Sequence, residues 1–159
     1  DWMRQCVADS LSKIQGDAAL AALWQAFTDR GYQRIGYLAS ALAMFTPEVI
    51  PRLCQVAAGN DPDLRYWAAV ALGSTGDERA VATLERLMAE DQGVTCFDGR
   101  VNVAAKKGLR TLRRIQAAIA ARSEEAAQRT ADGATNGAMD GPADGPTDGS
   151  AEGSTGPTS

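Results

Sequence analysis

Apolar residues recur along the first 122 residues at spacings of three and four, which place side chains on one face of an α-helix. Helix-breaking pairs interrupt this pattern regularly: Gly16-Asp17, Thr46-Pro47 and Gly76-Asp77 lie 30 residues apart. Further breaks fall between them, at Arg30-Gly31 and at residues 59–62. Because the intervals have the length of ordinary short helices, the pattern predicts pairs of helices.

The residues at the breaks indicate where each helix begins. Asp17, Thr46, Asp61 and Asp77 can act as N-caps, since a short polar side chain accepts hydrogen bonds from unpaired backbone N–H groups. The first helices of the pairs are predicted over residues 2–15, 32–45 and 62–75, and the second helices over 17–29, 47–58 and 77–90. A longer final helix is predicted over 98–121.

Equivalent positions of the pairs carry matching residues. The first helices align on Ala8, Ala39 and Ala69 and on Leu11, Leu42 and Leu72. The second helices align on Leu20, Ile50 and Val81, on Leu23, Leu53 and Leu84, and on Ala26, Val56 and Leu87. One helical hairpin cannot cover its own apolar face, so neighbouring hairpins must stack. The sequence therefore predicts an all-α fold, an α-solenoid of about three to four hairpins.

The stretch from residue 61 to 84 carries the most complete copy. It reads Asp-Pro-x-x-Arg, then an Ala-Ala pair, Leu-Gly, Gly-Asp, and a helix with an early Val and Leu. This stretch resembles the HEAT repeat, in the short variety first noted in phycobilisome lyases. The resemblance covers residues 2–110, and it implies a fold in which the second helices line the inner, concave side.

The composition changes after Arg122. Residues 1–122 carry a net charge of +2, whereas residues 123–159 carry −6 and are rich in Gly, Ala, Thr, Ser, Asp and Pro. A segment with almost no large apolar residues cannot bury enough surface to offset its ordering entropy. We therefore expect a solenoid domain at 1–122 and a disordered acidic tail at 123–159.

A partner-binding surface is predicted on the concave side. Polar residues occupy the second helices beside the leucine positions, and the predicted contact residues are Trp24, Gln25, Arg52, Gln55, Glu85 and Arg86. Such a surface could pair with carboxylates and backbone groups of a protein. The alternative is an ordinary solvated face, and Trp24 could equally belong to the core.

The last helix offers a second surface. Basic residues gather on it at Lys106, Lys107, Arg110, Arg113 and Arg114. This helix could bind nucleic acid, an acidic partner or the acidic tail, but we favour a soluble cap that closes the stack. Nucleic-acid binding is retained as an alternative function.

Catalytic machinery of the common kinds is missing from the sequence. It contains no histidine, which removes the usual Ser-His-Asp and Cys-His arrangements and histidine-based metal sites. Cys6, Cys54 and Cys96 are too widely spaced for a metal knuckle or a redox pair. Cys96 lies in the longest internal loop beside Phe97, where a small hydrophobic plug is favoured over a reactive thiol.

We therefore expect no metal, no cofactor and no catalysis. The expected function is a cytoplasmic, non-membrane scaffold that binds a protein partner and forms part of a larger protein. A bilin-lyase-like or DNA-glycosylase-like enzyme subunit is the remaining alternative, and the sequence leaves the oligomeric state open.

Overall fold

A computed structural model describes residues 2–29 and 35–136. The chain divides into two units, Asp1–Arg122 and Ser123–Ser159. Within the described residues the helices are α1 (Trp2–Ile14), α2 (Asp17–Thr28), α3 (Gly36–Ala43), α4 (Ile50–Ala57), α5 (Pro62–Thr75), the short 3-10 helix η1 (Glu78–Ala80), α6 (Val81–Glu90) and α7 (Val101–Asn136). No strand forms among these residues, so the predicted all-α solenoid is confirmed.

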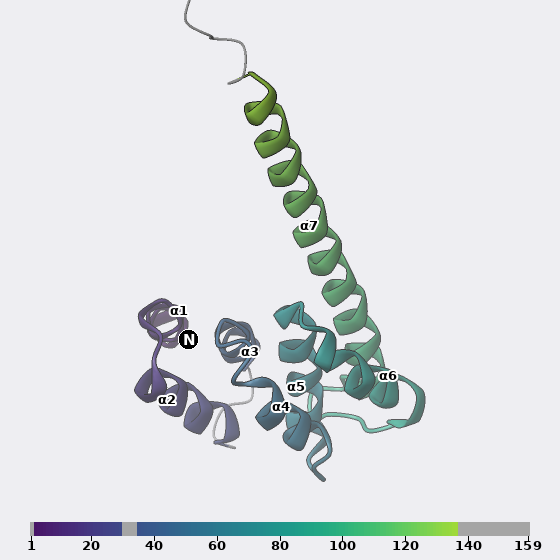
Figure 1. The fold of residues 1–159 in the computed structure, drawn as a ribbon. Helices are drawn as coiled ribbons and strands as arrows, with labels where there is room; N and C mark the ends of the chain where they lie inside the picture. The colour runs from purple at the N-terminus through teal and green to yellow at the C-terminus, as the bar shows by residue number, and fades with distance from the viewer. Residues whose placement is uncertain (1, 30–34, 137–159) are drawn as a thin grey trace, which may run out of the picture. The chain divides into compact units, whose positions relative to one another are not determined.

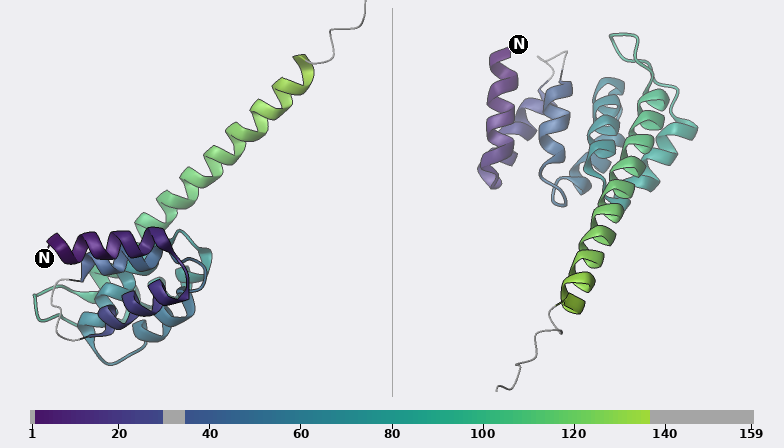
Figure 2. Two further views of the ribbon diagram at one scale, coloured as in Figure 1. Left: turned by 90° about the vertical axis from the view of Figure 1, so that its left-hand side faces the viewer. Right: turned by 90° about the horizontal axis from the view of Figure 1, so that it is seen from above.

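The helices of the first unit form two rows. In Figure 1, α1, α3 and α5 lie in one row and α2, α4 and α6 in the other, and the start of α7 continues the first row. Figure 2 shows α1, α3, α5 and α7 side by side when this row is viewed from above. Each hairpin thus stacks on the next, as expected for repeats that bury their apolar faces against neighbours.

Two of the four predicted N-caps form as expected. The Asp61 carboxylate accepts a hydrogen bond from the backbone N–H of Asp63 at 3.0 Å, with Pro62 at the first turn of α5. The Asp77 carboxylate accepts from the Arg79 N–H at 2.9 Å and opens η1. In both cases the side chain satisfies a donor that the helix leaves unpaired.

The other two predicted caps are wrong. Gly16, with a φ of 96°, occupies the N-cap position of α2, and Asp17 is already inside the helix. Thr46 closes α3 instead of opening α4, because its hydroxyl donates to the carbonyl three residues earlier at 2.8 Å. The helix α4 begins at Ile50 rather than at Pro47.

The repeated small and large apolar residues build one core. Ala8, Ala39 and Ala69 are buried, and so are Leu23, Leu53 and Leu84. The third position of the second helices differs from the prediction, since Ala26 and Val56 are only half-buried and the fully buried residues are Phe27 and Ala57. Burial at this position depends on the tilt of each helix, which spacing alone does not show.

The last helix of the first unit packs closely against α5. A Cβ added to Gly73 would lie 2.3 Å from the Gly108 Cα, so the two backbones touch at this crossing. Leu109 and Leu112 of α7 are buried on the same side. The helix also runs to Asn136, past the expected end near residue 121, because Ala, Glu, Arg and Gln after Arg122 favour helix. The rest of the predicted tail, residues 137–159, lies outside the described residues.

Candidate partner-binding surface

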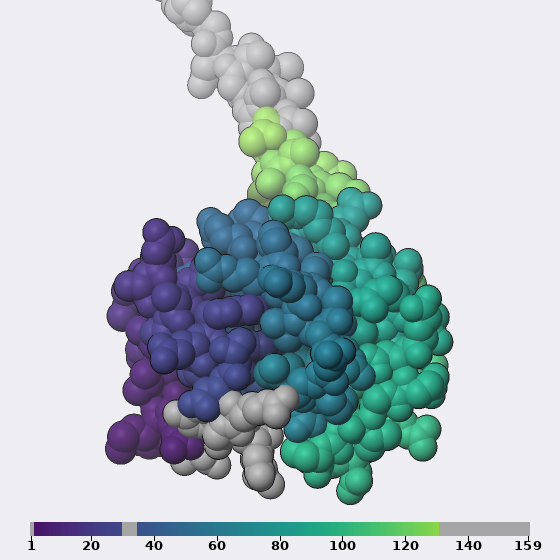
Figure 3. All heavy atoms as spheres, turned by 90° about the horizontal axis from the view of Figure 1, so that it is seen from below, coloured from purple at the N-terminus to yellow at the C-terminus, as the bar shows by residue number. Residues whose placement is uncertain are grey.

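The six predicted contact residues lie on the row formed by α2, α4 and α6. We call this set the second-helix surface; it consists of Trp24, Gln25, Arg52, Gln55, Glu85 and Arg86. Five of them are exposed and Trp24 is half-buried. In Figure 3, which views the first unit from this side, the indigo, blue and green bands of successive hairpins form a continuous surface.

Trp24 and Arg52 join the first two hairpins at this surface. The guanidinium carbon of Arg52 lies 5.9 Å from the centroid of the Trp24 ring, and the same ring stacks on buried Phe27 at 5.8 Å. The indole therefore contacts both a core residue and an exposed cation. A cation at this distance is attracted by the ring electrons and holds the ring in place. Both contacts restrain the orientation of the Trp24 ring.

Arg86 joins the second and third hairpins. Its guanidinium donates a hydrogen bond to the Ala57 carbonyl at the end of α4, at 3.3 Å. Beneath it, the Thr83 hydroxyl donates to the Cys54 sulfur at 3.3 Å. These bonds leave part of the Arg86 donor set unused, since a guanidinium carries five N–H groups. The residue can therefore bind a partner without leaving its place.

Glu85 connects the second-helix surface to α7. Its carboxylate lies 3.6 Å from the Arg113 guanidinium, and both side chains are more than half exposed. An ion pair this exposed contributes little to stability. Glu85 also lines a hollow of about 700 Å³ between α6 and α7, together with Gln116 and Ile119. The two surfaces predicted from the sequence therefore meet at this residue.

The basic residues of the last helix all face solvent. This basic surface consists of Lys106, Lys107, Arg110, Arg113 and Arg114, and each member is exposed. Leu109 and Leu112, by contrast, face the core. The helix thus has the apolar inner side and charged outer side that a terminal element needs.

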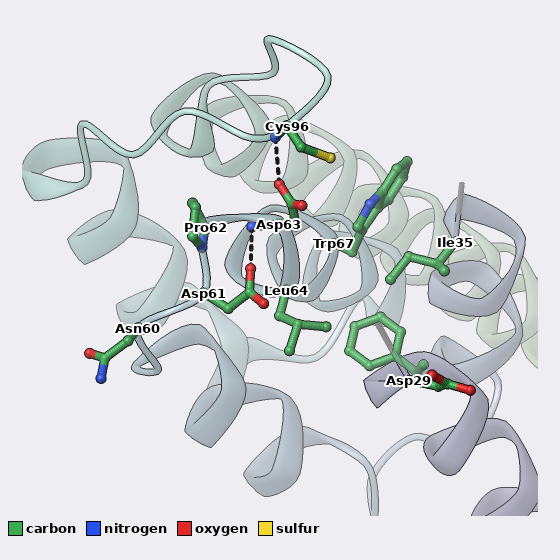
Figure 4. A pocket seen from close by; sticks show the side chains of 10 residues that line it. Asp29, Ile35, Asn60, Asp61, Pro62, Asp63, Leu64, Trp67 and Cys96 are labelled. Atoms are coloured by element: carbon green, nitrogen blue, oxygen red, sulfur yellow. Dashed lines mark hydrogen bonds between the residues drawn. The ribbon is translucent and has the colours of Figure 1, made fainter. Parts of the chain in front are cut away.

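A further cavity was not predicted. It has a volume of about 500 Å³ and lies where α5 begins, beside the end of α2 and the start of α3. Figure 4 shows Trp67, Leu64 and Ile35 along it, with Asp61 and Asp63 at the N-terminus of α5. Of these residues, only Asp61 had a role assigned from the sequence, as a helix cap, and nothing in the sequence pattern indicated a hollow here.

The loop at residues 91–100 closes this end of the molecule. The Cys96 N–H donates to the Asp63 carboxylate at 2.8 Å, and Phe97 packs edge-on against Tyr66 at 5.2 Å. The Phe97 ring centroid also lies 5.6 Å from that of Trp67, so Tyr66, Trp67 and Phe97 form one aromatic cluster. The Phe97 ring, which is 39% exposed, and the Cys96 backbone therefore both anchor the loop.

Hydrogen bonding with a carboxylate makes the Cys96 thiol less acidic. The Asp63 side chain, followed by desolvation, raises the pKa of Cys96 above its ordinary value. A thiol with a raised pKa holds less thiolate at neutral pH and is a weaker nucleophile. The Cys96 side chain is exposed, however, so the predicted hydrophobic plug at this position is wrong.

An ion pair holds the start of the loop at residues 91–100 in place. Arg65 makes two hydrogen bonds to the Asp91 carboxylate, at 2.6 and 3.1 Å, and a third to the Gly59 carbonyl at 3.1 Å. The carboxylate also accepts from the Gly93 N–H at 2.8 Å. Both charged side chains are largely buried, so dissolved salt screens the attraction between them only weakly. It links α5 to the end of α6.

The fold and these surfaces define an α-solenoid of stacked helical hairpins. A family model described as HEAT repeats matches residues 35–95, which run from the start of α3 into the loop after α6. HEAT-repeat domains are generally non-catalytic and commonly bind other proteins. Comparison with curated proteins and with solved structures found no match.

Two further observations concern the described residues only. They contain no group of three or more Cys, Asp or Glu side chains placed to hold a metal ion. None of their helices has both the length and the apolar character required to cross a bilayer.

Proposed function

We propose that the first unit is a non-catalytic scaffold whose second-helix surface binds a protein partner in the cytoplasm. The observation that carries the proposal is the Trp24–Arg52 contact, which presents an aromatic ring and a cation together on an exposed face. Tryptophan and arginine are the residues most enriched among those that dominate binding energy at interfaces. Gln25, Gln55 and Arg86 add polar donors along the same row.

The structural support is that this face is pre-ordered. The Trp24 ring stacks on the core residue Phe27, and Arg86 is bonded to the neighbouring hairpin. Side chains that are already fixed lose less conformational entropy when a partner binds. A peptide or helix that carries carboxylates would pair with Arg52 and Arg86.

Affinity capture with the full chain as bait, followed by titration calorimetry with the captured protein, tests the proposal. The variants Arg52→Ala and Arg86→Ala should each weaken binding by about tenfold or more, the loss of roughly 1.4 kcal/mol. Circular dichroism checks that the helices are retained. The matched control is Lys106→Ala with Arg110→Ala, which removes two exposed cations from α7 and should leave affinity unchanged.

The basic surface of α7 supports a second candidate, nucleic-acid binding. The five cations of this basic surface are all exposed. If they neutralise phosphates, the binding constant should fall as salt is added. A plot of its logarithm against the logarithm of the salt concentration should have a slope of about −0.9 per phosphate contacted. Fluorescence anisotropy with labelled DNA or RNA, for the parent chain and for the Lys106→Ala and Arg110→Ala variant, distinguishes the two functions. Binding that this variant abolishes would favour the second candidate over the first.

A further inference from the structure

The outer side of α1 carries an apolar stripe that has no covering element among the described residues. The stripe consists of Met3, Val7, Leu11 and Ile14, which share one face through spacings of four, four and three. Met3 is 72% exposed, Val7 54% and Ile14 73%. Three of these residues, Met3, Val7 and Leu11, line a hollow of about 580 Å³ whose other walls include Ala22 and Ala26 of α2 and Tyr37 and Leu38 of α3.

The repeat itself shows what covers this position elsewhere. The register that aligns Ala8 with Ala39 places Val7, Leu11 and Ile14 at the positions of Leu38, Leu42 and Phe45. Those three residues are 3%, 0% and 5% exposed. The preceding hairpin, α1 with α2, packs against α3, and all three residues belong to the common core. The same stripe is therefore an interior surface in the second hairpin and an open one in the first.

The two ends of the stack differ in this respect. At the far end, α7 covers the last hairpin through the Gly73–Gly108 crossing and turns charged residues outward. Terminal repeats of solenoids need such a polar outer side to stay soluble. The α1 stripe is apolar instead, like the equivalent buried positions of α3.

We infer that the α1 stripe is a docking surface for a further helical hairpin of the same repeat class. The hairpin would stack on α1 and α2 as these stack on α3. A second copy of the chain cannot supply this contact in the same geometry, because α7 already occupies the side of its last hairpin that would make it. This inference concerns a different surface from the one proposed above and does not depend on it.

A chain with an added hairpin tests the inference. A duplicate of residues 1–31 is placed directly ahead of Asp1 of the full chain, which keeps the 31-residue register between Ala8 and Ala39. The added hairpin should fold on the α1 stripe. The helical circular dichroism signal per molecule should therefore increase by the contribution of two further helices with the lengths of α1 and α2. The melting temperature should rise because one more interface forms.

One substitution at two equivalent places provides the matched control. Val7→Lys in the inner copy would bury a charge in the new interface and should lower the melting temperature by roughly 5 °C or more. The same Val7→Lys in the outer copy stays exposed and should lower it by at most about 1 °C. Equal effects in both copies, or no gain in helix on adding the hairpin, would overturn the inference.

Two other occupants are tested on the unmodified chain. Multi-angle light scattering should show no dimer that Val7→Lys dissociates, since such a dimer would assign the stripe to a second copy. Co-sedimentation with phosphatidylcholine vesicles should show no binding that Val7→Lys removes, since that would assign it to a lipid surface. Either result would contradict the inference.

Discussion

Replacing Gly73 by alanine should destabilise the first unit, although alanine is the better helix former. The added Cβ would lie 2.3 Å from the Gly108 Cα, 2.7 Å from its carbonyl oxygen and 2.8 Å from its carbonyl carbon. Carbon atoms pack best at about 3.5–4.0 Å, so α5 and α7 must move apart by more than about 1 Å. Every atom in the way belongs to a backbone, so no flexible side chain can yield.

The size of the effect follows from two opposed terms. Overfilling a close-packed core costs about 1–3 kcal/mol, and the contact between two backbones puts this site at the upper end, about 3 kcal/mol. Replacing glycine within a helix returns about 0.5–1 kcal/mol. The net destabilisation is therefore about 2 kcal/mol, which for a unit of this size lowers the melting temperature by roughly 6–8 °C.

Thermal unfolding followed by circular dichroism measures this difference. Ser74→Ala is the matched control, because it changes the next residue of α5 and only removes a bond from the Ser74 hydroxyl to the Val70 carbonyl. Gly108→Ala should also destabilise, since its Cβ would lie 2.7 Å from the Ala69 carbonyl oxygen. Once the helices have separated, the second substitution should add less than its single effect. A Gly73→Ala variant as stable as the parent would refute this account of the crossing.

Two further predictions concern the loop at residues 91–100. Burial of the Asp91 carboxylate acts to raise its pKa, but hydrogen bonds from Arg65 and the neighbouring backbone, with the positive charge nearby, outweigh it and hold the pKa below the ordinary 3.8. A depressed carboxyl pKa contributes stability above about pH 4, and this stability is lost as the pH falls through the pKa of the folded state. The urea concentration at the unfolding midpoint should therefore drop in that pH range. The variant Arg65→Ala should remove this pH dependence. Asp63→Ala should let the pKa of the Cys96 thiol fall, so iodoacetamide should label Cys96 faster at pH 8 while labelling of Cys6 stays the same; an unchanged rate would contradict the assigned contact.

The sequence by itself determined the local structure and the repeat. Apolar residues at spacings of three and four are sufficient to predict helices. A capping aspartate before proline begins α5 whatever the surrounding tertiary structure. The burial of Leu23, Leu53 and Leu84 was predictable for the same reason, since a repeated pattern buries equivalent residues. The role of Thr46 was not predictable, because its hydroxyl can accept at the start of one helix or donate to the end of the preceding one, and here it donates.

The tertiary structure decided which distant residues meet. Trp24 and Arg52 come together only because two hairpins stack, and helical spacing within either hairpin says nothing about that contact. The touching glycines of α5 and α7, and the loop held by Asp63 and Phe97, likewise depend on how the helices cross. The α1 stripe has the same apolar pattern as the buried face of α3, and its exposure depends on whether another hairpin packs against it. A hydrophobic pattern specifies which face seeks burial, whereas the packing of neighbours determines whether that face is covered.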